Sequence, residues 1–430
     1  MLVKNNFFLT LVQISFYFLP LSLIIGSLVV NINILIFLFL SLTYFINKKI
    51  PIKFNSTNIT LFLFFLTIII STLTHLDNLG IKIFLKSIFL LKFFLIYIVL
   101  ETLILNDKIN LRYFFNICLL LILFVSWDLL LQFTLGKNIL GYKPWEGRIT
   151  GIFEHEAIAG AYVQKIFIFA LIGILVLFFS KKISNNFYQI IFFITVLFAS
   201  FVASNRISFL ILISLTIFIG IFYNVFRKNI LISLFLLIPF FYLFSAFDSQ
   251  ISNKYQDFII KVEKLGNQTS ILQNENKTHK ENSSLSNHGK IYRTTIISFK
   301  ESKLIGNGLK SFRINCSKFL DQKNTLCSTH PHNYHLEVLH DSGILGFLLI
   351  SLFVFLLIFS KYKKLRFSQL DNNSKIIITL LLLNLLVEIF PLKSTGSLFT
   401  TWNGTLLWVS ISLVNYGGKK NLLNEKNTNS

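Results

Sequence analysis

The chain contains repeated apolar stretches of about twenty residues, and no other feature limits its possible folds as strongly. A helix of about 20 apolar residues crosses the hydrocarbon core of a bilayer. Short charged or Asn-rich breaks separate the stretches. Hydrophobic residues make up 54% of the 430 positions and charged residues 14%, so the chain is more apolar than an ordinary soluble domain. The sequence therefore predicts an all-α membrane protein.

The apolar stretches predict about twelve transmembrane helices, most of them joined by short loops. They cover approximately residues 6–26, 28–46, 59–76, 81–104, 113–135, 157–180, 187–203, 207–226, 229–247, 334–360, 375–392 and 398–416. Residues 1–247 would hold the first nine helices, and residues 334–430 the last three and a tail. Between these parts, residues 248–333 are expected to form one large hydrophilic loop that contains short helices.

The formal charge of +21 is distributed in a way that indicates topology rather than nucleic-acid binding. Lys and Arg lie in small clusters between apolar runs and not on one stripe. If the N-terminus is cytoplasmic, every basic doublet between spans falls on the cytoplasmic side, as the positive-inside rule requires. The first apolar stretch lacks a convincing small-residue cleavage site, so we expect a retained helix. Both termini are then cytoplasmic, and 248–333 lies outside.

The large loop divides into segments of different character. Apolar residues at helical spacing over 255–265 predict a short helix lying along the membrane. Residues 267–288 are rich in Asn, Ser, Thr, Lys and Glu, which predicts a flexible insertion. Helical periodicity returns over 291–303, and the glycines at 306–308 predict a structural turn before a second short helix. They do not complete a phosphate-binding GxGxxG motif, because Ser311 stands where the third glycine would be.

Two of the three cysteines lie in this outer loop. Cys316 and Cys327 are separated by ten residues, in a compartment where disulfides persist. A disulfide between them would stabilise the chain by about 2–4 kcal/mol relative to its reduced form. Two free thiols are the alternative. Cys118 lies in an apolar helix and is interpreted as a packing residue.

A histidine-rich segment stands at the outer end of the tenth predicted helix. Four of the eight histidines occur within residues 330–340, beginning with His330 and His332 and continuing with His335. Imidazole exchanges protons near neutral pH, so a general base is chemically reasonable. Solvated histidines without a role are the alternative. Zinc is disfavoured because the spacing does not match an HExxH pair, and no metal ligand is assigned.

Outward-facing cations give a second set of candidates. Arg206 follows a short turn between two apolar spans, and a guanidinium can donate two parallel hydrogen bonds to a phosphate. An arginine that only reaches toward the interface is the alternative. Together with Arg148, Arg293, Lys393 and possibly Lys82, it would make an outer face positive enough for a diphosphate. An anionic lipid-linked substrate fits such a face.

Acidic residues beside His155 open the sixth predicted helix. Glu154 and Glu156 flank this histidine, and carboxylates are favourable at a helix N-terminus. Helix capping is therefore one interpretation. Contact of Glu154 and His155 with a sugar or an acceptor is the other.

The segment from Cys327 to Glu337, followed by Gly343 and Gly346, resembles the signature of the bacterial O-antigen ligase and O-antigen polymerase superfamily. The order of the motifs agrees with this resemblance. Residues 148–153 come first, then 204–206, Arg293, 306–308 and finally His332 with Asn333. The resemblance covers most of the chain from about residue 140 onward, whereas the first five predicted helices match only in hydropathy.

The resemblance implies a GT-C-type glycosyltransferase of the bacterial inner membrane. Such an enzyme takes a glycan from undecaprenyl diphosphate on the periplasmic side and passes it to an acceptor hydroxyl, without metal, nucleotide sugar or other cofactor. It implies that Arg206 and Arg293 hold the diphosphate and that His332 activates the acceptor with support from Asn333. The favoured acceptor is lipid A core. An O-antigen or capsule polymerase and a protein O-oligosaccharyltransferase are alternatives within the family.

A multi-span transporter or lipid flippase is the alternative from a different class. It would also explain about twelve spans, but it predicts internal repeats, broken helices and charged residues near the membrane midplane. The sequence shows no clear repeat, and the candidate residues gather on one face.

Overall fold

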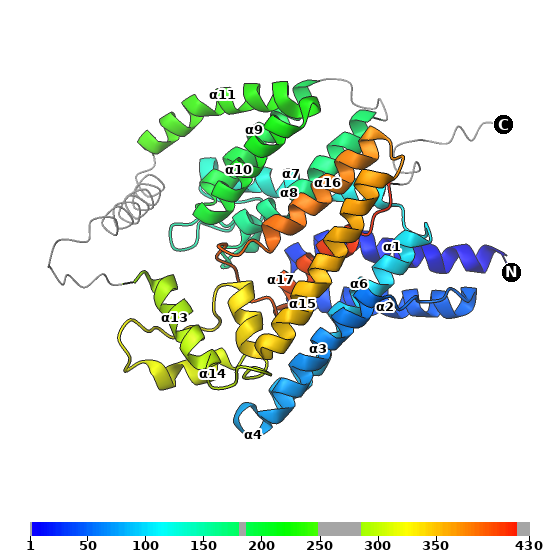
Figure 1. Cartoon of the computed structure of the whole chain (residues 1–430). Helices are drawn as coiled ribbons and strands as arrows, with labels where there is room; N and C mark the ends of the chain where they lie inside the picture. Colours follow the sequence, from blue (N-terminus) through cyan, green and yellow to red (C-terminus); the bar gives the residue numbers. More distant parts are fainter. Residues whose placement is uncertain (1, 180–185, 248–284, 419–430) are drawn as a thin grey trace. The chain divides into compact units, whose positions relative to one another are not determined.

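The computed structural model describes residues 2–179, 186–247 and 285–418, and within them the regular structure is helical apart from one isolated β-bridge (Figure 1). The chain divides into two compact units. The first unit takes Met1–Leu111 and Ser283–Leu422, and the second takes Arg112–Asn282 and Leu423–Ser430. Each unit is described by itself below.

The first unit contains the helices of both ends of the chain. They are α1 (Leu2–Ile25), α2 (Ser27–Lys48), α3 (Ser56–Thr74), α4 (Leu76–Leu79), α5 (Ile81–Phe89), α6 (Leu91–Leu105), α13 (Asn287–Phe299), α14 (Phe312–Asn315), the 3-10 helix η2 (Cys316–Phe319), α15 (Tyr334–Phe367), α16 (Asn372–Glu388) and α17 (Thr401–Leu413). Helix α15 packs along α3, α17 packs on α6, and α1 forms a hairpin with α2.

Local polar residues determine where several of these helices begin. The side-chain oxygens of Asn55, Asn333, Asp371 and Thr400 each accept a backbone N–H of the helix that follows. This is the usual way to satisfy the otherwise unpaired donors of a helix N-terminus. The sequence therefore fixes these starts locally.

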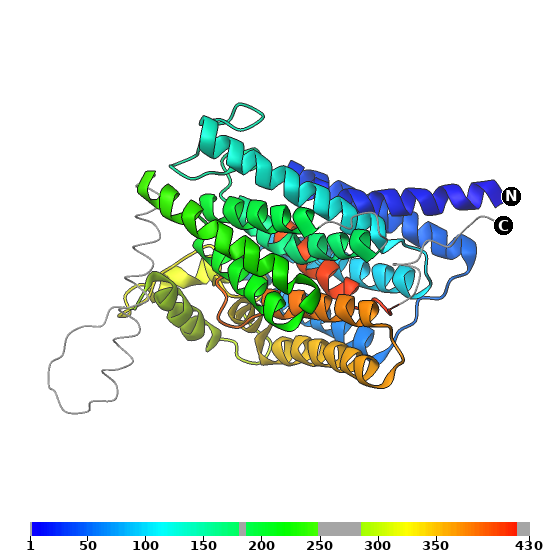
Figure 2. The same ribbon diagram turned by 90° about the horizontal axis from the view of Figure 1, so that it is seen from above.

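The second unit contains the middle helices. They are α7 (Leu111–Leu135), the 3-10 helix η1 (Gly151–Phe153), α8 (Ala159–Phe179), α9 (Asn186–Val202), α10 (Arg206–Phe222) and α11 (Asn224–Phe247). Helices α9, α10 and α11, green in the figures, lie side by side in both views (Figures 1 and 2). A buried hydrogen bond of 2.7 Å from Asn229 to Gln189 links α11 to α9, as polar side chains often do between membrane helices.

The predicted fold class, an all-α membrane protein, is confirmed. Each of the twelve predicted stretches is occupied by a helix, although 81–104 is shared by α5 and α6. Among the described residues, seven helical segments are long and apolar enough to cross a membrane. They are Phe7–Ile25, Ser27–Lys48, Ser56–Thr74, Ile81–Leu105, Leu111–Leu135, Ala159–Leu177 and Tyr334–Phe367. Helices α9 and α10 are shorter apolar helices, and the count of twelve spans stays a prediction.

Helix α15 departs from the predicted single helix over 334–360. Gly343 has φ 68° and ψ −171°, so the helical path is broken there. The expectation of one continuous helix is wrong at this point. The loop at 303–308 bonds to both sides of the break: Asn307 and Gly308 donate to the carbonyls of His340 and Asp341.

The residues that follow the break in α15 are also hydrogen-bonded to this loop. Ile344 N–H and Leu345 N–H donate to the carbonyls of Lys303 and Leu304, at 2.9 and 3.2 Å. Backbone groups that the break releases are thus satisfied by the loop, as buried backbone groups must be. The glycines at 306–308 therefore have the structural role that the sequence predicts.

The boundaries of the large loop also differ from prediction. Helix α13 begins at Asn287, where Ser286 accepts the N–H of Gly289, so the predicted insertion ends before His288. The predicted membrane-surface helix at 255–265 and the rest of the insertion up to 284 lie outside the described residues.

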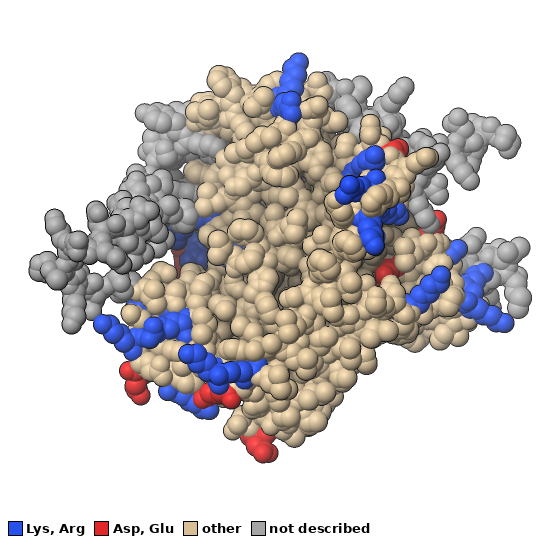
Figure 3. Space-filling view, viewed as in Figure 1, with Lys and Arg blue, Asp and Glu red and all other residues tan. Residues whose placement is uncertain are grey.

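Charge in the first unit gathers at the two ends of α15. In Figure 3, Lys and Arg cluster over α13 and α14 and again over the C-terminal end of α15, with mostly uncharged surface between them. The last turn of α15 contains Lys364 and Arg366. An apolar segment with charged ends is the pattern expected of a membrane span.

Candidate functional site

The second unit holds the candidate cations Arg148 and Arg206, and the loop that carries Arg148 is fixed by buried polar side chains of α7. Asp128 accepts the N–H of Ile139 at 2.9 Å. Gln132 accepts the N–H groups of Thr150 and Gly151, at 2.8 and 2.7 Å. Gly151 has φ 56° and its Cα faces the Asp128 carboxylate, where a Cβ would collide. The segment 148–153 is therefore held tightly against α7.

Arg148 lies at the end of a tight turn. Its backbone exchanges both hydrogen bonds with Trp145, at 3.0 and 2.8 Å. The two residues between them, Glu146 and Gly147, have φ values of 46° and 66°. Positive φ at both central residues is typical of a two-residue hairpin turn. The turn sets the backbone of Arg148, whose side chain is exposed.

Arg206 is the first residue of α10. Asn205 caps this helix by accepting the N–H of Ser208 at 3.4 Å. The turn before it packs closely on α8, because a Cβ at Gly160 would lie 2.8 Å from the Asn205 Cβ. Ser204 has φ 56°, a left-handed conformation that costs free energy in a non-glycine residue. Packing thus holds Arg206 at the positive end of a helix.

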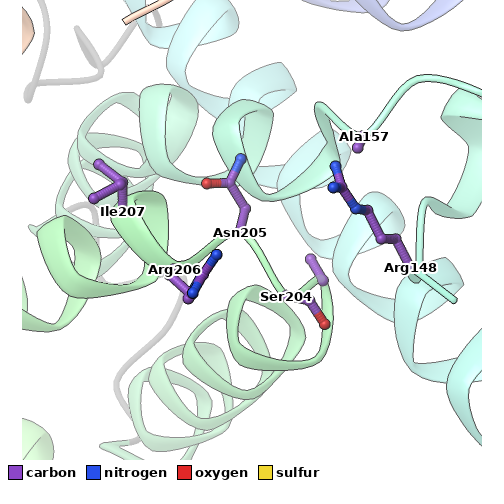
Figure 4. Close-up of a pocket in the computed structure, with 7 residues that line it drawn as sticks. Arg148, Ala157, Ser204, Asn205, Arg206 and Ile207 are labelled. Carbon is purple, nitrogen blue, oxygen red and sulfur yellow. The ribbon is translucent and has the colours of Figure 1, made fainter. Parts of the chain in front are cut away.

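Arg148 and Arg206 line one cavity of about 360 Å³, together with Ala157, Ala203, Ser204, Asn205 and Ile207. Figure 4 shows the two arginines on opposite sides of the Ser204–Asn205 turn. Two guanidinium groups at a helix N-terminus attract an anion and offer paired donors to phosphate oxygens. The cavity has the chemistry of a phosphate or diphosphate site.

Glu154 and His155 lie outside the lining of that cavity. Helix α8 begins at Ala159, so the expectation that these residues open a helix is wrong. Their side chains approach each other to 3.3 Å and are 48% and 72% exposed. His155 also contacts the Trp145 ring, with centroids 6.3 Å apart. Residues 154–158 thus form part of the loop, and contact with a sugar or acceptor stays a prediction.

In the first unit, a disulfide joins Cys316 and Cys327, with their Cα atoms 5.2 Å apart. The bridge packs in a small core with Ile291 and Phe312. Just before Cys327, Leu326 N–H donates to the Thr294 hydroxyl of α13 at 3.0 Å. These contacts fasten the segment that leads to the histidines.

His332 is held from several sides. Its Nε2 lies 3.1 Å from the Ser328 hydroxyl, and its carbonyl accepts Thr395 N–H at 2.9 Å. Its ring lies 4.0 Å from that of His330 and 5.2 Å from that of His288, between centroids. Its backbone has φ 57°, a strained conformation that packing must maintain. Such strain is common at functional sites.

The surroundings keep this histidine neutral. Burial lowers the pKa of His332, and the charge of His288 acts in the same direction. Burial and the charge of His332 lower the pKa of His330 to about 4. A neutral imidazole at pH 7 can accept a proton. Within the described residues, no three His, Cys, Asp or Glu side chains form a metal-binding group.

Asn333 holds the chain segment before α17 against α15, and Lys393 ties the same segment to the end of α16. Asn333 caps α15, and its Nδ2 donates to the carbonyl of Pro391 at 2.6 Å. The ammonium of Lys393 is 3.0 Å from Glu388, and both side chains are buried. Each residue thus has a structural role, and substrate contact by either one stays a prediction.

Arg293 lies on the outer face of α13. The buried residues of this helix are Ile291, Thr294, Thr295 and Ser298, which share one face, whereas Arg293 is exposed. At 100° per residue, Arg293 falls on nearly the opposite side. The residue of α13 whose ring contacts His332 is His288.

The remaining histidines of the segment have structural partners. His335 donates from Nε2 to the carbonyl of Ile389 at 2.7 Å. His340 is fully buried between Ser298 and Asp341, at 3.0 and 2.9 Å. His340 is thus less accessible than His332, which is half-buried.

An apolar cavity of about 350 Å³ runs beside α15. Its lining includes His335, Phe347 and Val354 of α15 and Leu407 and Trp408 of α17. A cavity of this size and character suits hydrocarbon.

Sequence reasoning missed two neighbours of His332. His288 was assigned to the polar insertion, although Ser286 followed by renewed apolar periodicity marks a helix start. Ser328 stands four residues before His332, and no sequence pattern indicates that the chain folds back to bring their side chains together.

Comparison with known proteins supports the resemblance seen in the sequence. Residues 190–351 match the family model described as O-antigen ligase. The match covers less than half of the chain and extends from α9 into α15. No curated protein matches the chain.

Proposed function

Because residues 190–351 carry the O-antigen ligase family domain, we propose that this multi-pass membrane protein transfers a glycan from undecaprenyl diphosphate to an acceptor hydroxyl at the periplasmic face of the inner membrane. The observation that carries the proposal is the cavity lined by Arg148 and Arg206 at the N-terminus of α10. It offers a diphosphate both charge and paired hydrogen-bond donors.

In the proposed reaction, the acceptor oxygen bonds to the anomeric carbon of the glycan while the bond from that carbon to the diphosphate oxygen breaks. His332 takes the proton of the acceptor hydroxyl, and the bonding electrons leave with the diphosphate. Arg206, with Arg148 and Arg293, stabilises the negative charge that develops on the leaving group. The lowered pKa of His332 supports its role, because the imidazole is neutral before the reaction.

The apolar cavity beside α15 supports a lipid-linked substrate. It adjoins His335, three residues after His332, and continues along the apolar part of the helix. A polyprenyl or acyl chain in this cavity would keep the reacting end of a lipid close to the histidine segment.

Transfer to lipid A core is the favoured reaction, and repeat-unit polymerisation or protein O-glycosylation are the alternatives at the same site. Deletion of the gene distinguishes the first two. Accumulation of free lipid-linked polymer is expected of a ligase. Loss of all polymer, with single repeat units remaining on lipid A core, would indicate a polymerase.

Purified protein with a lipid-linked glycan and an acceptor tests the mechanism. We expect His332→Ala and Arg206→Ala each to lower the transfer rate about 100-fold or more, the scale of lost acid–base or electrostatic catalysis. Lys228→Ala removes an exposed cation of α11 and should leave the rate unchanged. A chelator should also leave it unchanged. Undiminished transfer by both test variants would refute the mechanism.

A further inference from the structure

The C-terminal end of α15 carries a dense group of cations that takes no part in the proposed transfer. After the break at Gly343, the helix continues over residues 344–367, which is about 36 Å of helix. The hydrocarbon core of a bilayer is about 30 Å thick, so the last turns of α15 reach the headgroup region. Four cations lie there within six residues: Lys361, Lys363, Lys364 and Arg366.

These cations divide between the two faces of the helix. Lys361 is buried one turn after the buried Leu357, so it lies on the inward face, and Lys364 is half-buried. At 100° per residue, Lys363 and Arg366 fall on the outward side, and both are exposed. Two of the four charges are therefore open to the surroundings of the protein.

Aromatic rings hold the two outward cations in place. The ammonium of Lys363 lies 4.6 Å from the ring centroid of Phe359, and the guanidinium carbon of Arg366 lies 5.4 Å from that of Phe367. Arg366 also donates to the Tyr362 hydroxyl at 2.9 Å. Residues three apart on a helix are neighbours, so the two cations stand side by side. The rings fix both charges without neutralising them.

No acid pairs with these two cations within the part of the chain that the structure describes. The ion pairs found there involve His155, His340 and Lys393 instead. Asp371, the acid nearest to them in the sequence, accepts the N–H of Ser374 at the start of α16. Two exposed cations that are fixed close together without an acidic partner attract an anion.

The same face of α15 is aromatic on the side toward the middle of the helix. The rings of Phe355 and Phe359 stack with centroids 5.7 Å apart, and their side chains are 59% and 41% exposed. Phe355 also borders the apolar cavity beside α15. Apolar rings thus precede the two cations, in the order in which a phospholipid presents its acyl chains and its phosphate. We define the α15 end surface as Phe355, Phe359, Tyr362, Lys363, Arg366 and Phe367.

We propose that the α15 end surface binds an anionic phospholipid of the bilayer, with the lipid phosphate between Lys363 and Arg366 and an acyl chain along the phenylalanine rings. A guanidinium donates paired hydrogen bonds to phosphate oxygens, and an ammonium adds a point charge. Basic residues next to the end of a membrane helix recognise such headgroups. A zwitterionic headgroup fits less well, because its own cation is repelled.

The inference goes beyond the proposed glycan transfer and does not depend on it. The lipid is a component of the bilayer and not a substrate, and Lys363 and Arg366 lie outside the candidate site. Binding can therefore be measured without a transfer assay.

Native mass spectrometry of the full-length protein, purified in a neutral detergent, tests the site. Phosphatidylglycerol and phosphatidylcholine with the same acyl chains are the probes. We expect the protein to retain phosphatidylglycerol in preference. Lys363→Gln/Arg366→Gln should weaken phosphatidylglycerol binding at least tenfold and leave phosphatidylcholine binding unchanged. Its thermal midpoint without added lipid should equal that of the unmodified protein, since both replaced side chains are exposed.

Two further variants separate the site from general surface charge. Lys48→Gln/Lys49→Gln removes two exposed cations from the end of another span, α2, and should bind phosphatidylglycerol as the unmodified protein does. Phe359→Leu keeps an apolar side chain but removes the ring that holds Lys363. It should weaken phosphatidylglycerol binding about two- to fivefold, the scale of an exposed cation–π contact.

Three outcomes would overturn the proposal. Equal retention of both lipids by the unmodified protein would show that no anionic headgroup is selected. Unchanged phosphatidylglycerol binding in Lys363→Gln/Arg366→Gln would show that these cations do not hold the lipid. An equal loss in Lys48→Gln/Lys49→Gln would show a general response to surface charge. Absence of glycan transfer together with selective lipid binding would count against the transfer proposal alone.

Discussion

At the residue scale, His332 has the surroundings of a proton acceptor. Ser328 bonds to Nε2, the carbonyl of His332 is fixed by Thr395, and the rings of His330 and His288 stand close by. Burial favours the neutral ring. Because a lone imidazole in water would be partly protonated near neutral pH, these contacts matter to the proposed role.

The pH dependence of transfer follows from this environment. Since the pKa of His332 is lowered, the neutral form persists below the usual histidine range, and the rate should fall only as the pH drops through the lowered pKa. His288→Gln removes a repelling charge, so the acidic limb of the pH–rate profile should move to higher pH. His75→Gln, at the end of α3, serves as control. An unmoved limb in His288→Gln would contradict this electrostatic coupling.

Substitutions in the buried Lys393–Glu388 pair distinguish a structural role of Lys393 from a role in substrate binding. Lys393→Met removes a 3.0 Å ion pair from the buried Glu388 carboxylate and should lower the free energy of unfolding by at most about 5 kcal/mol, measured by thermal unfolding in detergent. Lys393→Met/Glu388→Leu should recover most of this loss. If the double variant is stable but transfers no glycan, one of the two charged groups acts in transfer as well as in folding.

At the element scale, the break in α15 and the 303–308 loop depend on each other. Gly343 occupies a left-handed conformation in contact with the loop backbone, and Gly306 packs against it from the other side. The break redirects the chain so that Tyr334 through Ser342 forms a separate helical segment before the long apolar one.

Gly343→Ala tests this dependence. A Cβ there meets the backbone of Leu304 and Gly306, so the backbone must shift at a cost of more than about 1–2 kcal/mol. We expect a lower thermal midpoint and faster proteolysis within the loop. Gly289→Ala, in the first turn of α13, should be tolerated because its Cβ meets only side-chain atoms. Equal stability of both variants would contradict the proposed coupling.

The disulfide between Cys316 and Cys327 should constrain the position of the histidine segment. Reduction removes a constraint worth about 2–4 kcal/mol and frees the chain just before Ser328. We expect a slower transfer rate after treatment with a reductant, and an equal decrease in Cys316→Ser/Cys327→Ser without it. If reduction also slows this double variant, the reductant acts elsewhere and the disulfide is not the cause.

At the scale of the whole molecule, the matched family domain takes helices from both compact units. It begins in α9 of the second unit and ends in α15 of the first. The Arg148–Arg206 cavity and the histidine segment are therefore built by separate sets of helices. Each set is apolar enough to require a bilayer.

Membrane topology can be tested by labelling single cysteines in intact cells. With a cytoplasmic N-terminus, Glu146→Cys should react with an impermeant thiol reagent from outside. Lys49→Cys and Lys363→Cys should react only after the cells are opened, since positive residues mark the cytoplasmic side. Outside labelling of Lys49→Cys would invert the predicted orientation.

The sequence by itself determined the helices and the candidate motifs. Apolar runs long enough for a bilayer form helices whose backbone bonds lie within each segment, so local composition is sufficient to predict them. Caps such as Asn333 and Asn205 are local for the same reason. The order of the arginine, glycine and histidine motifs is also visible in the sequence, and it supports the resemblance to the O-antigen ligase and polymerase superfamily.

Tertiary structure alone decided what these residues face. Packing of α13 on α15 turns Arg293 outward and brings His288 to His332. The break at Gly343 depends on hydrogen bonds to a loop nearly forty residues earlier in the chain. Such contacts depend on helices distant in sequence, whose mutual packing no local pattern encodes.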